Sequence, residues 1–197
     1  MVGNKMSFPH LLVLMSALIS IFGSYVYIRD TLKGKTKPNR VSWSMWAFAP
    51  LLGTGAALAA GADPWTTVRI FLAGFLPLIV FLTSFINKKS YWKLTHFDLL
   101  CCVSSAAAIL VWVFLKSPRM AILFAAIGDG FAALPTFLKA WKYPETETGA
   151  TYFAGLIAVL LVIPSIPNWD IENSAFQIYL LIINVIMVFA IYRKRLF

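Results

Sequence analysis

The stretch YIRDTLKGKTKPNRVSWSMWAF, residues 27–48, carries a basic, proline-containing turn between two apolar segments. A turn of the same kind returns in LPTFLKAWKYPETETGATYFAG, residues 134–155, and a shift of 106 positions superposes the two turns without a gap. The shift pairs residues of similar kind, namely Lys33 with Lys139, Pro38 with Pro144, Ser42 with Thr148 and Trp46 with Tyr152. An internal repeat of this kind is typical of membrane proteins built from duplicated units.

The composition of the chain indicates a bilayer environment. Of its 197 residues, 60% are apolar and 13% are charged, whereas soluble domains have roughly half and a quarter. Apolar stretches long enough to cross a bilayer occupy residues 9–28, 41–60, 64–86, 97–115, 119–138, 149–164 and 174–192. The sequence therefore predicts an all-α integral membrane protein with seven transmembrane helices and short connections.

The repeat divides these seven predicted spans into two triplets. Residues 1–94 hold the first three-helix bundle, residues 95–117 a linker helix, and residues 118–197 the second three-helix bundle. Because the linker span reverses the chain once, both triplets enter the membrane in the same direction, as parallel repeats. Two bundles in one chain make a monomer sufficient, so an oligomer is not required.

The basic side chains predict the orientation. The chain has 17 Lys and Arg against 8 Asp and Glu, and most of the basic residues fall in alternate loops. By the positive-inside rule these loops are cytoplasmic, which places the N terminus outside and the C terminus inside a cell (plasma or inner) membrane. This basic face also suits anionic lipid head groups. Since orientation explains the basic excess, we do not expect nucleic acid as a partner.

Two polar residues lie deep in the predicted spans. Asp129 lies near the middle of the fifth, in AAIGDGFAALP, and Asn184 lies at a similar depth in the seventh, in LIINVIMVF. A carboxyl group at that depth is costly unless it faces protein or water, which favours a proton-coupling or substrate-binding role for Asp129. An amide can donate and accept hydrogen bonds, which favours a substrate-binding role for Asn184. The alternatives are a structural carboxyl group and an interhelical hydrogen bond.

Three further residues are candidates for the solute pathway. Trp46 and Tyr152, equivalent by the repeat, fall in the inner halves of the second and sixth predicted spans, where they would contact the solute and close an inner gate. Arg69 lies about one turn inside the outer end of the third predicted span. It either extends to the outer interface or attracts anions at an outer vestibule. Interfacial anchoring is the alternative for the aromatic pair, and it is the role expected of Trp43, Trp65, Trp92, Trp141 and Trp169.

At this point the chain resembles the SWEET and PQ-loop superfamily of small transporters, over most of its length. Pro135 and Thr136 stand where the family has its Pro-Gln pair, and a basic stretch and Thr148 follow. In the first repeat, Arg29 occupies the register of the family's first proline. Pro50 lies about where the family has a proline in its second span. The resemblance implies a three-plus-one-plus-three fold with Pro50 and Pro135 as hinges, and an asparagine that contacts substrate at Asn184.

The sequence thus predicts a transporter that moves a small solute by alternating access, with Asp129 as the candidate for proton coupling. The alternative is a non-transporting receptor or assembly factor on the same scaffold. We expect no enzymatic activity, no cofactor and no metal site. An aspartyl protease needs two deep carboxyl groups, whereas only one is found, and His10 and His96 lie near span ends. The seventh span also has no lysine for a Schiff base.

Overall fold

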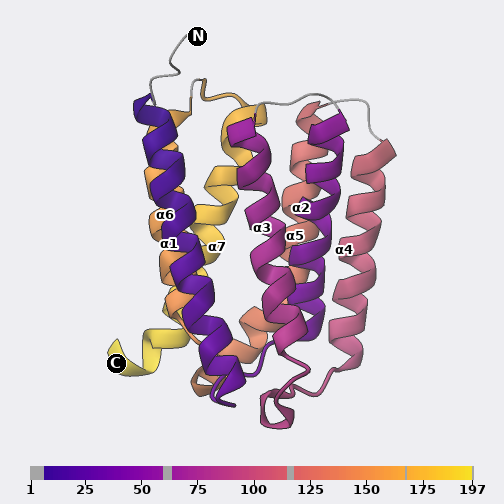
Figure 1. Cartoon of the computed structure of the whole chain (residues 1–197). Coiled ribbons are helices and arrows are strands. Elements are labelled where there is room, and N and C mark those ends of the chain that lie inside the picture. The colour runs from indigo at the N-terminus through magenta and orange to yellow at the C-terminus, as the bar shows by residue number, and fades with distance from the viewer. Residues whose placement is uncertain (1–6, 60–63, 115–117, 167, 197) are drawn as a thin grey trace.

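Seven α-helices run side by side in the part of the chain that the structure describes (Figure 1). This computed structural model describes residues 7–59, 64–114, 118–166 and 168–196. The helices are α1 (Phe8–Leu32), α2 (Arg40–Ala59), α3 (Pro64–Thr83), α4 (His96–Phe114), α5 (Pro118–Lys142), α6 (Ala150–Val162) and α7 (Ile171–Leu196). Short 3-10 turns lie at Lys88–Ser90, Pro144–Thr146 and Ile163–Ser165. The prediction of an all-α protein is confirmed.

Several helices have the length and apolar character of membrane spans. Within the described residues, three segments are long and apolar enough to cross a membrane: Phe8–Leu32, Ile122–Lys142 and Ser174–Lys194. Shorter apolar helical segments lie in α3, α4 and α6. Large apolar side chains also point outward, among them Phe22, which is 66% exposed, and Phe153, which is 52% exposed. An outer surface of this kind suits lipid better than water, in agreement with a membrane location.

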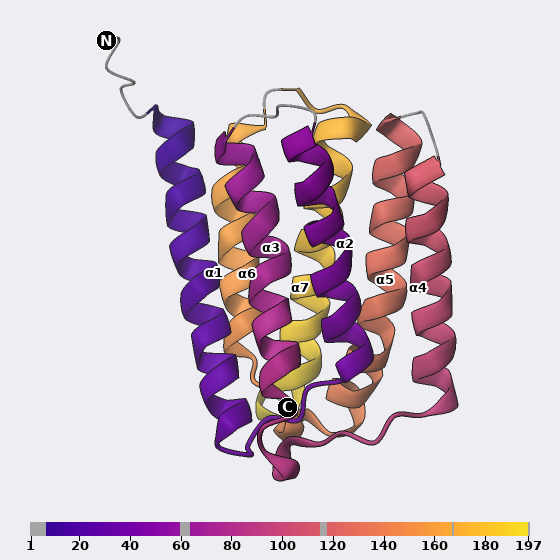
Figure 2. The same cartoon turned by 45° about the vertical axis from the view of Figure 1, so that its right-hand side comes forward.

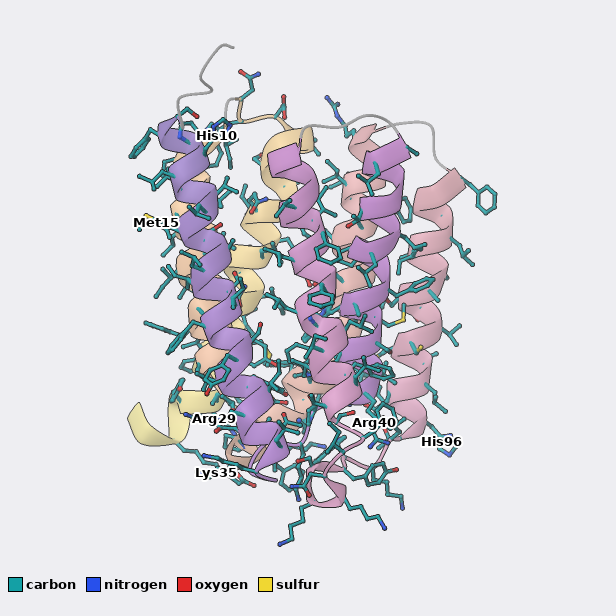
Figure 3. The ribbon with its side chains drawn as sticks, in the orientation of Figure 1. His10, Met15, Arg29, Lys35, Arg40 and His96 are labelled. Atoms are coloured by element: carbon teal, nitrogen blue, oxygen red, sulfur yellow. The ribbon has the colours of Figure 1, made fainter. Side chains whose placement is uncertain are left out.

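The two ends of the bundle differ in charge. Arg29, Lys35 and Arg40 lie at one end and His10 lies at the other (Figure 3). We call the first of these the basic end, and it is also the end near which the chain terminates (Figure 1). His96 lies at the basic end too, so the two histidines are far apart (Figure 3).

Polar residues fix the connections at the basic end. Gly34 has a φ of +74°, a left-handed conformation that glycine adopts without strain and that turns the chain after α1. The Asn87 amide donates to the carbonyl of Leu32, the last residue of α1, at 2.8 Å. Asn39 caps α2 through its side-chain oxygen, and its amide donates to the Asp98 carboxylate at 2.9 Å. These contacts tie the start of α2 to the start of α4.

Each triplet has its third helix in contact with the other two. Helix α3 packs against α1 and α2, and α7 packs against α5 and α6. Between the triplets, α1 packs on α6 and α2 packs on α5, whereas α4 lies at the edge beside α5 (Figure 2). Under the shift of 106 positions, α1 corresponds to α5 and α2 to α6. Under the repeat, the α1–α6 interface therefore corresponds to the interface between α5 and α2.

Two hydrogen bonds between the triplets follow the same pattern. The Thr136 hydroxyl donates to the Ser42 hydroxyl at 2.7 Å, and the Thr148 hydroxyl donates to the Asp30 carboxylate at 3.1 Å. Thr136 lies 106 positions after Asp30, and Thr148 lies 106 positions after Ser42. The four residues therefore make two contacts that are equivalent under the sequence repeat.

Gly74 lets α2 and α3 approach closely, and we expect its replacement by alanine to destabilise the protein. A Cβ atom at Gly74 would lie 2.9 Å from two backbone atoms of α2, the Ala47 oxygen and the Leu51 nitrogen. Since backbone atoms cannot move aside alone, Gly74→Ala should cost about 1–3 kcal/mol, measured by denaturant titration in detergent. Gly55 in α2 is the control, because a Cβ atom there meets nothing within 4 Å. Equal stability of Gly74→Ala and Gly55→Ala would contradict the close packing.

Candidate functional site

A cavity of about 250 Å³ lies between the two triplets, lined by residues of α1, α2, α3, α6 and α7. Helix α1 contributes Ser16, Ser20 and Ser24, which are spaced one helical turn apart and so share one face. Helices α6 and α7 contribute the hydroxyl group of Thr151 and the amide of Asn184. Among the described residues that line the cavity, none is charged. The site is therefore suited to an uncharged solute with hydrogen-bonding groups.

The polar groups of the cavity are held in place by their own helices. The Ser16 hydroxyl donates to the Val13 carbonyl at 2.7 Å, and the Ser20 hydroxyl donates to the Ser16 carbonyl at 2.9 Å. The Asn184 amide nitrogen donates to the Leu180 carbonyl at 2.8 Å. These hydrogen bonds occupy the O–H groups of the serines and one N–H of the amide. The hydroxyl and amide oxygens keep lone pairs that can accept hydrogen bonds from a ligand. The site thus presents acceptors to groups that donate.

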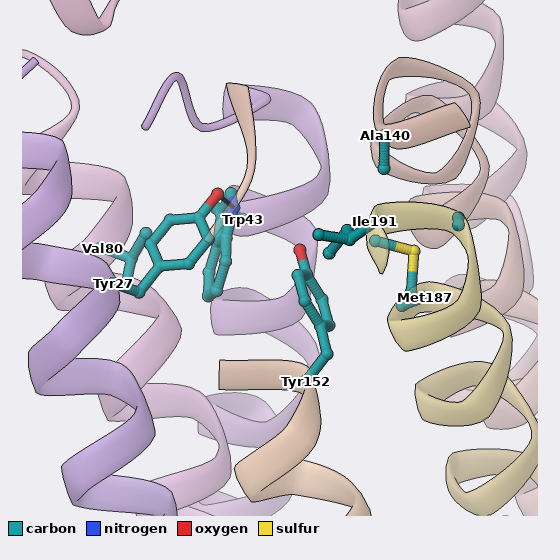
Figure 4. Close-up of a cluster of buried hydrophobic side chains, with 8 residues drawn as sticks. Tyr27, Trp43, Val80, Ala140, Tyr152, Met187 and Ile191 are labelled. Carbon is teal, nitrogen blue, oxygen red and sulfur yellow. Dashed lines mark hydrogen bonds between the residues drawn. The ribbon is translucent and has the colours of Figure 1, made fainter. Parts of the chain in front are cut away.

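A layer of buried aromatic side chains lies between this cavity and the basic end. Trp43 lines the cavity, and its ring centroid is 4.6 Å from that of Tyr27. Tyr152 meets Tyr27 edge-on, with 6.5 Å between the ring centroids. Figure 4 shows Tyr27 and Trp43 side by side, with Tyr152 across from them. Tyr27 is fully buried, and Trp43 and Tyr152 are at least 94% buried.

Hydrogen bonds link this aromatic layer to a buried carboxylate. The Trp43 indole N–H donates to the Tyr27 hydroxyl oxygen at 3.2 Å, and the Tyr27 hydroxyl donates to Glu147 Oε2 at 2.9 Å. The Tyr152 hydroxyl donates to the same carboxylate oxygen at 3.4 Å. Glu147 lies between the Pro144–Thr146 turn and α6. One carboxylate therefore accepts hydrogen bonds from both triplets.

Glu147 also forms a buried ion pair. Lys139 Nζ contacts Glu147 Oε1, and both side chains are at least 99% buried. The Lys139 ammonium group donates to the Lys37 carbonyl oxygen and lies 5.3 Å from the centroid of the Trp92 ring. Burial raises the pKa of Glu147 above its ordinary value, and Lys139 and the two tyrosine hydroxyls oppose that rise by stabilising the carboxylate. Lys139 is thus a buried ion-pair partner, whereas the sequence predicted an orienting charge in a loop.

A second cavity, of about 530 Å³, lies at the basic end and is lined by residues of α1, α6, α7 and the connection before α6. Glu147 lines it, together with Asp30 and Thr148. Tyr192 and Lys194 of α7 line it as well. Trp43 and Glu147 therefore belong to the walls of different cavities, and Tyr27 joins the two residues by hydrogen bonds.

The structure separates Asp129 from Asn184. Asn184 lines the central cavity, but Asp129 is not among the described residues that line it. The Tyr179 hydroxyl donates to Asp129 Oδ2 at 2.6 Å, which joins α5 to α7 within the second triplet. The buried indole N–H of Trp46 has no hydrogen-bond partner among the described residues.

The other predicted site residues take various positions. Trp46 packs edge-on against Trp43, with 5.3 Å between the centroids, and so joins Tyr152 in one aromatic cluster outside the central cavity. Pro50 and Pro135 lie inside α2 and α5. They do not line the cavity, whereas Pro77 of α3 does. Arg69 belongs to α3, but its side chain is outside the described part of the structure.

Sequence reasoning missed three features of the site. The expectation that Trp43 anchors the protein at the membrane interface is wrong, because its side chain is 4% exposed and packs against Tyr27. The serine face of α1 could have been found from its spacing of four residues. The pairing of Lys139 with Glu147 could not, because Glu147 lies in a loop where no helical periodicity applies.

Comparison of the chain with protein-family models, with curated proteins and with solved structures finds no match.

Proposed function

We propose that this chain is a multi-pass membrane transporter, in which seven spans move a small solute by alternating access between two triplets of helices. The observation that carries the proposal is the cavity between the triplets, which is lined by hydroxyl and amide groups. Sites between repeated units are where such transporters bind their solutes. The equivalent contacts of Thr136 with Ser42 and of Thr148 with Asp30 support a fold built from two related halves.

The proposal includes the expected family and orientation. The contacts of α3 and α7 with the other helices of their triplets, and the exchange of interfaces under the 106-residue shift, agree with the three-plus-one-plus-three arrangement of the SWEET and PQ-loop superfamily. The basic end would face the cytoplasm of a cell membrane. The N terminus would then lie outside.

The lining of the cavity suggests the class of solute. A buried charge on a ligand needs a compensating charge, and the described lining residues offer none. A small uncharged solute with hydroxyl or amide groups would find hydrogen-bonding partners in Ser16, Ser20 and Asn184, and an aromatic surface in Trp43.

Uptake by proteoliposomes tests the proposal. The purified protein, reconstituted and oriented, is given a panel of radiolabelled uncharged polar solutes and a matched panel of charged ones. We expect saturable uptake of at least one uncharged solute above empty liposomes. Absence of uptake for every solute, with folded protein in the membrane, would argue against transport.

Replacing Asn184 by alanine should weaken uptake of the solute. Loss of one hydrogen bond to a buried polar group costs about 1–3 kcal/mol, so the concentration for half-maximal uptake should rise by about fivefold or more. Asn168→Ala is the control, because Asn168 is exposed and is not among the lining residues. An unchanged half-maximal concentration would remove Asn184 from the binding site.

A receptor or assembly factor on the same scaffold is the second candidate. It is favoured by the position of Asp129, whose contact with Tyr179 lies within one triplet and away from the cavity. Uptake is measured with and without an imposed proton gradient, in the parent and in Asp129→Asn, and absence of uptake under every condition would favour the receptor or assembly factor. Gradient-driven uptake that Asp129→Asn abolishes would assign proton coupling to Asp129. Gradient-driven uptake that survives in Asp129→Asn would leave that residue a structural role.

A further inference from the structure

We propose that Tyr27, Glu147 and Lys139 form a gate that closes the central cavity toward the basic end. In the conformation described, the gate is shut. Opening requires the Tyr27 hydroxyl to leave the Glu147 carboxylate, so that α1 and the start of α6 separate. The role of this gate in solute movement rests on the proposed transport function, but its opening and closing can be measured without any solute.

The gate residues connect the walls of two cavities. Trp43 lines the central cavity and Glu147 lines the cavity at the basic end. Tyr27 accepts a hydrogen bond from Trp43 at 3.2 Å and donates one to Glu147 at 2.9 Å. Two hydrogen bonds therefore lead from the wall of one cavity to the wall of the other. Displacement of the Tyr27 side chain would remove the link between those walls.

The contacts of the gate join the two triplets. Tyr27 belongs to α1 in the first triplet, whereas Glu147 and Lys139 belong to the second. Lys139 donates to the carbonyl oxygen of Lys37, in the first triplet's basic turn. The backbone N–H of Lys37 in turn donates to the Thr146 carbonyl at 2.9 Å. The basic end is thus held shut by bonds that must break if the triplets move apart there.

The ion pair of the gate departs from the symmetry of the repeat. The residues 106 positions before Lys139 and Glu147 are Lys33 and Val41. Lys33 is exposed, and Val41 is a buried apolar residue. The ion pair is therefore absent from the equivalent place in the first repeat, so the duplicated fold does not require it. A buried ion pair often contributes little net stability. A role in switching between a closed and an open state is therefore compatible with this pair.

The ion pair also suits a contact that must open. Apolar side chains gain nothing from water when their contact separates. Separated carboxylate and ammonium groups, in contrast, can each replace the lost partner by water. The cavity of about 530 Å³ beside Glu147 is large enough to supply that water. The gate would therefore open toward a wet space, where the separated charges are solvated.

Cysteine labelling tests the gate. Ser24 lines the central cavity and is buried, so Ser24→Cys reports access to that cavity. A membrane-impermeant maleimide is added on the side of the basic end, in a background in which Cys101 and Cys102 are replaced by serine. The rates are compared in the parent, in Tyr27→Phe and in Glu147→Gln. Tyr25→Phe is the matched control, because Tyr25 lies on the same helix and is 59% exposed.

We expect labelling of Ser24→Cys to be about threefold to tenfold faster in Tyr27→Phe, because that substitution removes a hydrogen bond from the closed state alone. Glu147→Gln should act in the same direction, and Tyr25→Phe should label at the parent rate. Equal rates in the parent, Tyr27→Phe and Glu147→Gln would overturn the gate.

Unfolding is measured separately through Cys101, which is 3% exposed. Proteins that keep Cys101 but carry Cys102→Ser and no Ser24→Cys should label equally slowly in the parent and in Tyr27→Phe, the variant that leaves the Lys139–Glu147 ion pair intact. Faster labelling of Cys101 in step with Ser24→Cys in Tyr27→Phe would show general loosening and would overturn the proposal. If labelling responds as expected but no solute is taken up, the gate stands and the transport function fails. If solute is taken up but labelling does not respond, the gate fails alone.

Discussion

Lys139→Met is expected to lower the free energy of unfolding by about 3–5 kcal/mol, because removal of one partner leaves a charged group buried. Lys139 Nζ contacts Glu147 Oε1, and both side chains are at least 99% buried. The remaining carboxylate would keep its tyrosine donors but lose its counter-charge. Denaturant titration of the protein in detergent, followed by tryptophan fluorescence, measures the change.

Two further variants serve as controls for the stability of Lys139→Met. Lys142→Met removes a positive charge one turn further along α5, where the side chain is exposed, and should change stability by less than about 0.5 kcal/mol. The double variant Lys139→Met with Glu147→Gln should recover more than half of the loss, since neither charge then remains. If Lys139→Met proves as stable as Lys142→Met, the buried ion pair does not hold the basic end together.

Gly155→Leu is expected to reduce solute uptake by at least about tenfold, the consequence of losing about 1.4 kcal/mol of binding. Gly155 lines the central cavity, and a Cβ atom there would come within 2.5 Å of the Asn184 side-chain oxygen. The first added carbon therefore displaces the amide, and the rest of the leucine side chain occupies space that the solute needs. Initial rates of uptake in proteoliposomes provide the measurement.

The control for Gly155→Leu is Gly55→Leu, which adds the same side chain to a helix where a Cβ atom meets nothing within 4 Å. Gly55→Leu should retain uptake. Both proteins are first checked by gel filtration, because overpacking by itself costs about 1–3 kcal/mol. Full uptake by folded Gly155→Leu would exclude the central cavity as the solute site.

The fold was largely predictable from the chain. Long apolar stretches predicted the helices, because a helix satisfies its backbone groups within one segment. The helix boundaries differ from the predicted spans by several residues at the basic end, where α1 continues to Leu32 and α5 to Lys142. Polar residues such as Thr31 remain helical there, because the last turns pack against neighbouring elements and are buried.

The site was predictable only in part. Asn184 lies in the wall of the cavity, and Trp46 and Tyr152 share an aromatic cluster beneath it. Depth in a span, by which Asp129 was chosen, does not specify which side of a helix a residue faces. Asp129 instead contacts Tyr179. The serine face of α1 was predictable from the sequence, because Ser16, Ser20 and Ser24 recur every four residues.

The sequence by itself determined the helical class, the apolar outer surface and the basic end, because these depend on composition and on order along the chain. It also determined which residues correspond under the 106-residue shift. Only the tertiary structure decided that Lys139 meets Glu147 and that Tyr27 lies between two cavities. These contacts join segments more than 100 residues apart, as Tyr27 and Glu147 are, or connect a helix to a loop. The long-range contact depends on how the triplets pack, and the Lys139–Glu147 contact depends on how the loop folds back on α5, neither of which local periodicity specifies.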